Sequence, residues 1–446
     1  MQKEERHHRK DDEPLIMKTT LKNGVDGLGR IGAFSPYFFL PFVLVLYFIV
    51  SEFDFHRFSY FNISVSVWPA VLLSLVAYYI GVWAADRGRW VFPAFGLGSL
   101  RGKTVWFIWI LTMIGAIAYA GMLATGQIGL TDESVRRNLD PKLNLLSQLL
   151  WFGVVLLLAI KIFKEENLTK RKAFNYGAIY FVAMVLFLLM GYRTPIAVML
   201  FTGVIIFHFI IKRIRLSWLF GGMAVIALFF SIFGFIRFST EDPNEVFNSR
   251  EQPDVELSDR QEQKLKTDQQ IMNETPEWVR SLNGEMVNGH IVLSKIIEYT
   301  KDEGYLKGQL ISGAFGSILP GDQVFPRVKV TEVVNSLSVE DGRYITRPNR
   351  TTTPTYIGQL FLDGGYPLVF VGFFAFGAII SMLYNQMKRE GVRSYQTVAY
   401  AFVTTIFTVS LHTGLLDIIF FLMIGFVILT AAIELDRTKK KSLKTL

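Results

Sequence analysis

Repeated apolar runs of bilayer length constrain this chain more than any other feature of its sequence. Runs of about 17 to 21 residues carry almost no charge, and a helix of that length crosses about 30 Å of hydrocarbon. The sequence therefore predicts an all-α polytopic membrane protein with about ten transmembrane helices. The predicted spans cover residues 35–50, 64–85, 104–122, 143–163, 175–190, 195–211, 216–236, 364–384, 396–411 and 413–433.

A single long polar segment interrupts this pattern between Arg237 and Thr353. A transporter is expected to hold its substrate among broken helices near the bilayer midplane. A membrane enzyme acting on a lipid-linked substrate instead needs a folded surface where the lipid head group emerges, so the segment favours an enzyme. The predicted organisation is a disordered tail (1–34), seven spans (35–236), a large extracytoplasmic loop with amphipathic helices (237–353), three spans (354–433) and a basic tail (434–446).

The distribution of basic residues predicts the orientation of the chain. Short cytoplasmic loops collect Lys and Arg, so both termini are expected in the cytoplasm and the long loop outside. The net charge of +8 is attributed to this signal and to attraction for anionic lipids, not to nucleic-acid binding. The chain has no cysteine, which excludes disulfides and cysteine-based zinc or nucleophile chemistry. The basic segments are the N-terminal tail and residues 87–103, 164–172, 212–215, 388–393 and 437–444.

Within the long loop, composition changes along the chain. Residues 241–275 are rich in charged and amide side chains and predict an exposed insertion. From Thr275 to Gly304 apolar residues recur at helical spacing, which predicts an amphipathic helix on the membrane or on the bundle. Apolar residues over 310–319 predict a second, shorter amphipathic element.

Five arginines on the predicted outer side are candidate phosphate ligands, because a guanidinium matches phosphate oxygens in a bidentate manner. Arg193 lies in a tight turn between the fifth and sixth spans, and Arg237 ends the seventh. The alternative for these two is an anchor at the membrane interface. Arg343, Arg347 and Arg350 precede the eighth span, and their alternative role is that of a solvated basic loop.

Four further side chains are candidates for proton transfer. His412 lies in the predicted turn between the last two spans, and Asp417 lies deeper, in an apolar segment where an ionisable group indicates function by default. The alternatives are a hydrogen-bonded turn residue for His412, and an arginine pair or a helix cap for Asp417. His290, in the amphipathic helix, and Asp363, beside the eighth span, complete the set.

Three segments resemble the oligosaccharide repeat-unit polymerases, the Wzy type of bacterial polysaccharide polymerase. They are GYRTP from Gly191, PGDQVFPRVK from Pro320 and TPTYIGQLFLDGGYP from Thr353. The resemblance is strongest over residues 304–385. It implies a GT-C-like membrane glycosyltransferase, in the bacterial plasma membrane, whose family arginines correspond to Arg193 and to the three loop arginines.

The same resemblance implies the reaction. The growing glycan is transferred from undecaprenyl diphosphate to the non-reducing end of another lipid-linked repeat unit, without nucleotide sugar, cofactor or obligatory metal. The implied partners are the lipid-linked donor and acceptor, membrane lipids, a chain-length regulator and a flippase. Cationic donors would stabilise the charge left on the pyrophosphate, and a general base would assist the acceptor hydroxyl.

Three other functions remain open from the sequence alone. A polysaccharide ligase would share the topology and the arginines and differ only in its acceptor. A GT-C transferase using a monophosphate lipid would direct attention to Glu52 and Asp54 in the first outer loop, which otherwise read as solvated surface. A flippase for lipid-linked glycans is disfavoured by the asymmetric long loop and by the lack of an evident internal repeat.

Overall fold

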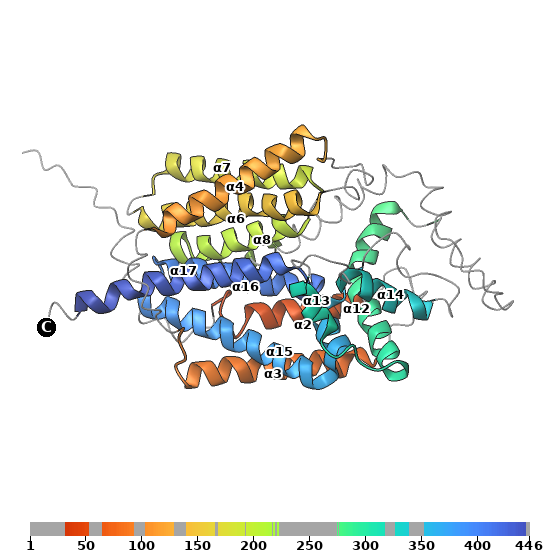
Figure 1. The fold of residues 1–446 in the computed structure, drawn as a ribbon. Coiled ribbons are helices and arrows are strands. Elements are labelled where there is room, and N and C mark those ends of the chain that lie inside the picture. The colour runs from red at the N-terminus through yellow and green to blue at the C-terminus, as the bar shows by residue number, and fades with distance from the viewer. Residues whose placement is uncertain are drawn as a thin grey trace, which may run out of the picture.

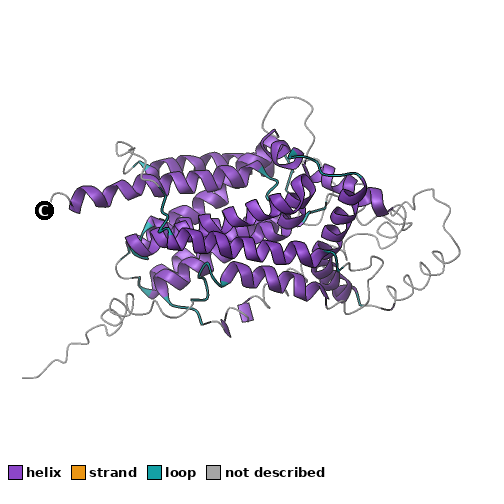
Figure 2. Cartoon of the chain, turned by 90° about the horizontal axis from the view of Figure 1, so that it is seen from below, coloured by secondary structure: helices purple, strands orange, loops and turns teal. Residues whose placement is uncertain are grey.

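The structure is a computed structural model that describes residues 32–52, 65–92, 103–128, 140–165, 168–191, 193–215, 217–218, 221–222, 274, 276–316, 326–338 and 352–442. In this part of the chain every regular element is a helix, and most of the helices lie side by side in an elongated bundle (Figures 1 and 2). The bundle helices are α2 (Phe39–Glu52), α3 (Val67–Arg87), α4 (Thr104–Ala124), α6 (Pro141–Lys164), α7 (Lys170–Leu189), α8 (Arg193–Ile206) with the π-helical η2 (Phe207–Ile211), α15 (Thr355–Glu390), α16 (Tyr395–Thr413) and α17 (Ile418–Ser442). Three others, α12 (Glu277–Asp302), α13 (Gln309–Gly316) and α14 (Pro326–Ser338), gather at one end of it (Figure 1).

Six helices among the described residues are long and apolar enough to cross a membrane, and they match the predicted second to sixth and eighth spans. The first predicted span is a shorter apolar helix, as is the apolar part of α17, Ile418–Glu434. Most of the span predicted over 216–236 lies outside the described residues, so the count of ten stays a prediction. The ninth predicted span is α16, which is buried at nearly every position because α2, α6, α8, α15 and α17 surround it.

The eighth span differs from the prediction, since α15 begins at Thr355 and not at residue 364. Gly364 and Gly365 leave helical geometry, and Gly365 has φ 67° and ψ −157°, a conformation open essentially to glycine alone. In a continuous helix Tyr356 and Phe376 would be about 30 Å apart, yet their ring centroids are 4.1 Å apart. Residues 355–363 are therefore a short arm that folds back along the membrane-length part of α15.

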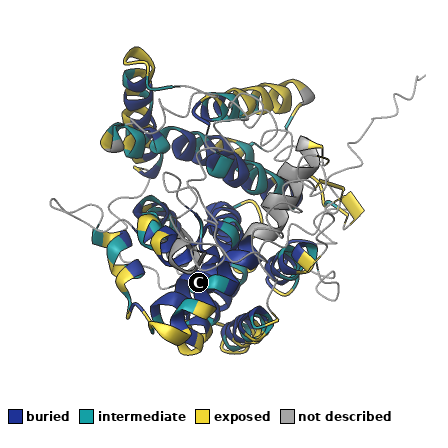
Figure 3. Cartoon of the chain, turned by 90° about the vertical axis from the view of Figure 1, so that its right-hand side faces the viewer, coloured by how far each residue is buried: buried dark blue, intermediate teal, exposed yellow. Residues whose placement is uncertain are grey.

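Close glycine contacts join this part of α15 to α3. A Cβ added at Gly81 would come within 2.1 Å of the Phe374 carbonyl oxygen, and one at Gly377 would come within 2.1 Å of the Tyr78 carbonyl oxygen. Such small residues let two membrane helices approach backbone to backbone. Around the bundle, Figure 3 shows buried residues toward the interior and exposed ones on the outer faces, as expected of helices that face lipid.

The two ends of the bundle differ in charge. At one end lie basic residues: Lys388 Nζ is 4.0 Å from the Asp86 carboxylate, and Arg393 donates to the backbone carbonyl oxygen of Glu165 at 2.9 Å. The other end carries α12, α13 and α14 (Figure 1). The amphipathic helix predicted from Thr275 is confirmed as α12, and Gly304 follows its end with φ 80°.

Candidate functional site

Polar side chains converge at the end of the bundle that α12, α13 and α14 cover. The C-terminal turns of α2 and α16 reach this end, together with the start of α17 and the short arm of α15. The start of α8 reaches it as well, because Val198 lines one small cavity with Ser410 and Thr413 from the last turns of α16. Segments far apart in the sequence therefore share one polar region.

A bidentate ion pair links α14 to the start of α17. Arg327 Nη2 lies 2.6 Å from Asp417 Oδ2, and Arg327 Nε donates to Oδ1 at 3.3 Å. Both side chains are part-exposed, at 31% and 39%. The prediction that Asp417 lies inside a span is wrong, because α17 begins at Ile418 and Asp417 is in the preceding turn. The alternative of an arginine pair is confirmed.

His412 is held from the side by α2. It was predicted in the turn between the last two spans. In the structure α16 continues to Thr413, so His412 lies in the last turn of this helix. Its Nδ1 is hydrogen-bonded to the Tyr47 hydroxyl at 2.8 Å. A Cβ on Gly289 of α12 would come within 2.0 Å of that hydroxyl, so the glycine makes room for Tyr47. The half-buried His412 ring is thereby oriented by Tyr47 of α2.

His290 occupies a closed environment next to the same turns of α2. Its side chain is fully buried, and Nδ1 lies 3.0 Å from Ser51 Oγ and 3.8 Å from Glu52 Oε1. The Ser51 hydroxyl also donates to the Phe48 carbonyl oxygen at 2.6 Å. Glu52 also accepts from Trp68 at 2.9 Å. These contacts favour a packing role for His290, since a buried ring cannot reach a substrate.

Asp363 ends the short arm of α15 and caps α13. Its carboxylate oxygens accept from the backbone N–H groups of Leu310 and Ile311, both at 3.0 Å, and the side chain is 2% exposed. The Leu306 N–H donates to the Leu362 carbonyl oxygen at 2.8 Å beside it. A carboxylate at a helix N-terminus satisfies unpaired donors and complements the helix dipole. Asp363 thus fixes α13 on the arm.

Gln359 on the same arm fixes the turn between α16 and α17. Its amide nitrogen donates to the Leu415 carbonyl oxygen at 3.1 Å, and its amide oxygen accepts from the Leu415 N–H at 2.6 Å. Gly414 lies next to this amide and has φ 70°. The arm therefore sets the positions of His412 and Asp417, which lie on either side of this turn.

Only one of the five predicted arginines lies in the described part of the chain. Arg193 is the first residue of α8, half-buried, at the same end of the bundle as His412. The other four, Arg237, Arg343, Arg347 and Arg350, lie outside the described residues, as does Asp54. Sequence reasoning missed Arg327 and Tyr47. Arg327 does follow the sequence PGDQVFP, and a cation at a helix start was the available signal.

The fold and this site define a multi-pass helical membrane protein with a polar centre at one end of its bundle. The sequence matches the family described as "Putative O-antigen polymerase" over residues 32–275 and 280–424. The chain therefore belongs to the O-antigen polymerase family, which confirms the resemblance predicted from the sequence. Searches of curated proteins and of solved structures gave no match.

Proposed function

We propose that this chain polymerises lipid-linked oligosaccharide repeat units at the outer face of the bacterial plasma membrane. The growing glycan moves from undecaprenyl diphosphate to the non-reducing end of another lipid-linked repeat unit. Membership of the O-antigen polymerase family supports the polymerase activity. The observation that carries the assignment of the site is the convergence of Arg327, Asp417, His412 and Arg193 at one end of the bundle.

The arginines are assigned to the donor diphosphate. Cleavage of the sugar–diphosphate bond sends its electron pair to a phosphate oxygen, and preorganised cations stabilise that charge. Arg327 is preorganised by its two contacts with Asp417, and Arg193 is fixed at the start of α8. The predicted ligands Arg237, Arg343, Arg347 and Arg350 remain part of the proposal.

His412 is assigned as the general base. The acceptor hydroxyl oxygen attacks the anomeric carbon of the donor, and the hydroxyl proton passes to the imidazole. Of the four predicted candidates, His290 is fully buried, Asp363 caps α13 and Asp417 is paired with an arginine. His412 is half-buried, and Tyr47 orients its ring.

Purified protein with lipid-linked repeat units, and the products resolved on a gel, tests the proposal. A polymerase yields a ladder of lipid-linked products from this one substrate. The reaction is repeated with a lipid A core or a protein acceptor. Product formed only with such an acceptor would identify a ligase, and substrate moved across a vesicle membrane without a new bond would identify a flippase.

A further inference from the structure

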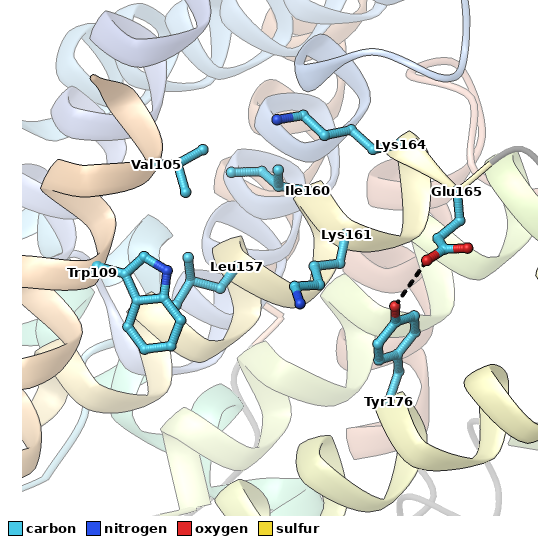
Figure 4. Close-up of a pocket in the computed structure, with 8 residues that line it drawn as sticks. All are labelled: Val105, Trp109, Leu157, Ile160, Lys161, Lys164, Glu165 and Tyr176. Atoms are coloured by element: carbon cyan, nitrogen blue, oxygen red, sulfur yellow. Dashed lines mark hydrogen bonds between the residues drawn. The ribbon is translucent and has the colours of Figure 1, made fainter. Parts of the chain in front are cut away.

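A cavity of about 340 Å³ opens between α4, α6 and α7 (Figure 4). It lies near the start of α4 and the end of α6, at the end of the bundle opposite α12, α13 and α14 (Figure 1). Its volume is in the range of ordinary small-ligand sites. The wall consists of aliphatic and aromatic side chains together with three charged ones. The lining residues are Val105, Trp109, Leu157, Ile160, Lys161, Lys164, Glu165 and Tyr176.

The packing of α4 on α6 explains why a cavity forms here. The two antiparallel helices touch backbone to backbone in their middle, where a Cβ on Gly115 would come 2.2 Å from the Leu150 nitrogen. One on Gly153 would come 1.9 Å from Thr112 Oγ1. Toward the start of α4 and the end of α6 the residues that line the cavity are Val105, Trp109, Leu157 and Ile160, which are all larger than these glycines. The cavity is therefore part of the helix packing.

The acidic residue of the cavity has a basic partner, whereas the two lysines do not form ion pairs with any residue that the structure describes. Glu165 accepts from Lys172 Nζ at 2.7 Å and from the Tyr176 hydroxyl at 3.2 Å. The pKa of Glu165 is lowered mainly by the hydrogen bond from Lys172, so this carboxylate stays ionised and paired with Lys172. Among the described residues no carboxylate forms an ion pair with Lys161 or Lys164. Their side chains lie on either side of Ile160 (Figure 4).

The exposed faces of α4 and α7 carry large apolar side chains. Trp106 and Ile117 on α4 are 60% and 68% exposed, and Phe181 on α7 is 65% exposed. In a membrane protein these residues face lipid tails. A ligand that satisfies both features carries an anionic head group and long hydrocarbon chains.

We propose that this cavity binds an anionic phospholipid, with its phosphate between Lys161 and Lys164 and its acyl chains along the exposed face of α4. Basic pockets between transmembrane helices recognise anionic head groups in this way. The lipid would fasten α7 to the α4–α6 pair, since all three helices line the cavity. This site is independent of the proposed catalytic function.

Native mass spectrometry of the purified full chain, with phosphatidylglycerol or phosphatidylcholine added, tests the proposal. Phosphatidylglycerol is expected to stay bound and to raise the unfolding temperature, and phosphatidylcholine is not. A lysine near an anionic lipid contributes about 1 kcal/mol, so Lys161→Gln and Lys164→Gln should each weaken binding about fivefold and the double variant about 30-fold.

Two further variants separate a specific site from general attraction. Lys142→Gln removes the same charge from the opposite end of α6 and should leave binding unchanged. Val105→Phe keeps every charge but narrows the cavity and should weaken retention. Equal binding of the two lipids, or an unaffected double variant, would overturn the proposal. Displacement of the lipid by inorganic phosphate at matched concentration would show a site for free phosphate instead.

Discussion

Arg327 contacts both carboxylate oxygens of Asp417, with Nη2 2.6 Å from Oδ2 and Nε 3.3 Å from Oδ1. The contact joins α14 to the connection between α16 and α17. His412 lies at the other end of this connection, in the last turn of α16. Bidentate geometry fixes the plane of the guanidinium, which a lysine ammonium could not reproduce. The requirement for arginine at this position is therefore a test of the proposed diphosphate site.

Arg327→Ala should lower the polymerisation rate about 100- to 1,000-fold, the usual loss for a preorganised transition-state donor. Arg327→Lys should recover little, because it keeps the charge and loses the fork. Asp417→Asn should have a smaller effect, since it only loosens the arginine. The measurement is product length and amount, normalised to folded protein in the membrane. If Arg327→Leu combined with Asp417→Leu restores normal turnover, the pair serves folding alone.

Arg193 allows the same comparison at the start of α8. If it binds phosphate, Arg193→Ala should lower turnover by about 100-fold or more at unchanged protein level, and Arg193→Lys should restore little. An interface anchor behaves differently: the lysine variant stays fully active, and the alanine variant lowers the amount of protein. Arg389→Ala, at the opposite end of the bundle, is the matched control and should be silent.

His412→Gln removes the proposed base and should lower turnover about 100- to 10,000-fold while leaving donor binding intact. Tyr47→Phe keeps the aromatic packing and removes only the hydroxyl that meets Nδ1 at 2.8 Å, so a smaller loss is expected. The pH dependence of the rate should also change in Tyr47→Phe, because this hydroxyl is a direct partner of the imidazole. An active His412→Gln with a normal pH profile would exclude His412 as the base.

Local sequence patterns predicted most of the helices. They could not predict contacts between residues that are far apart in the sequence. The helical spacing before Gly304 predicted α12, because that signal lies within the helix itself. Tyr47 and His412 are 365 residues apart, and Arg327 and Asp417 are 90 apart, so no periodicity connects them. For Asp417 the sequence predicted an ion pair with an arginine as one alternative, but it did not predict which arginine.

The short arm of α15 was missed for a related reason. Residues 355–363 are too few to cross a bilayer as a helix, so hydropathy placed the start of the eighth span only at residue 364. Their burial depends on Leu293 and Ile296 of α12, which lie against Gly358. The glycine pair at 364–365 was the available sign of a chain reversal.

Gly365→Ala should destabilise the arm by about 1–3 kcal/mol, because only glycine adopts φ 67° with ψ −157° at low energy. The new Cβ would also come 2.7 Å from the Tyr305 ring. Since the arm carries Gln359 and Asp363, activity should fall together with the unfolding temperature. Gly121→Ala in α4 is the control, with no atom within 4 Å of the new Cβ and a small gain in helix propensity. Equal stability of the two variants would contradict the proposed reversal.

The orientation of the chain decides whether the site can meet its substrate at the outer face. Basic segments gather at the end of the bundle that carries Lys388 and Arg393, and α12 to α14 lie at the other end. The positive-inside rule predicts that the first end is cytoplasmic. Alkaline phosphatase fused after Gln269 should therefore be active, and phosphatase fused after Lys440 should be inactive. As the complementary test, a fluorescent protein fused after Lys440 should be fluorescent. The reverse pattern would put Arg193, Arg327 and His412 on the cytoplasmic side, and the proposed outer-face reaction would fail with it.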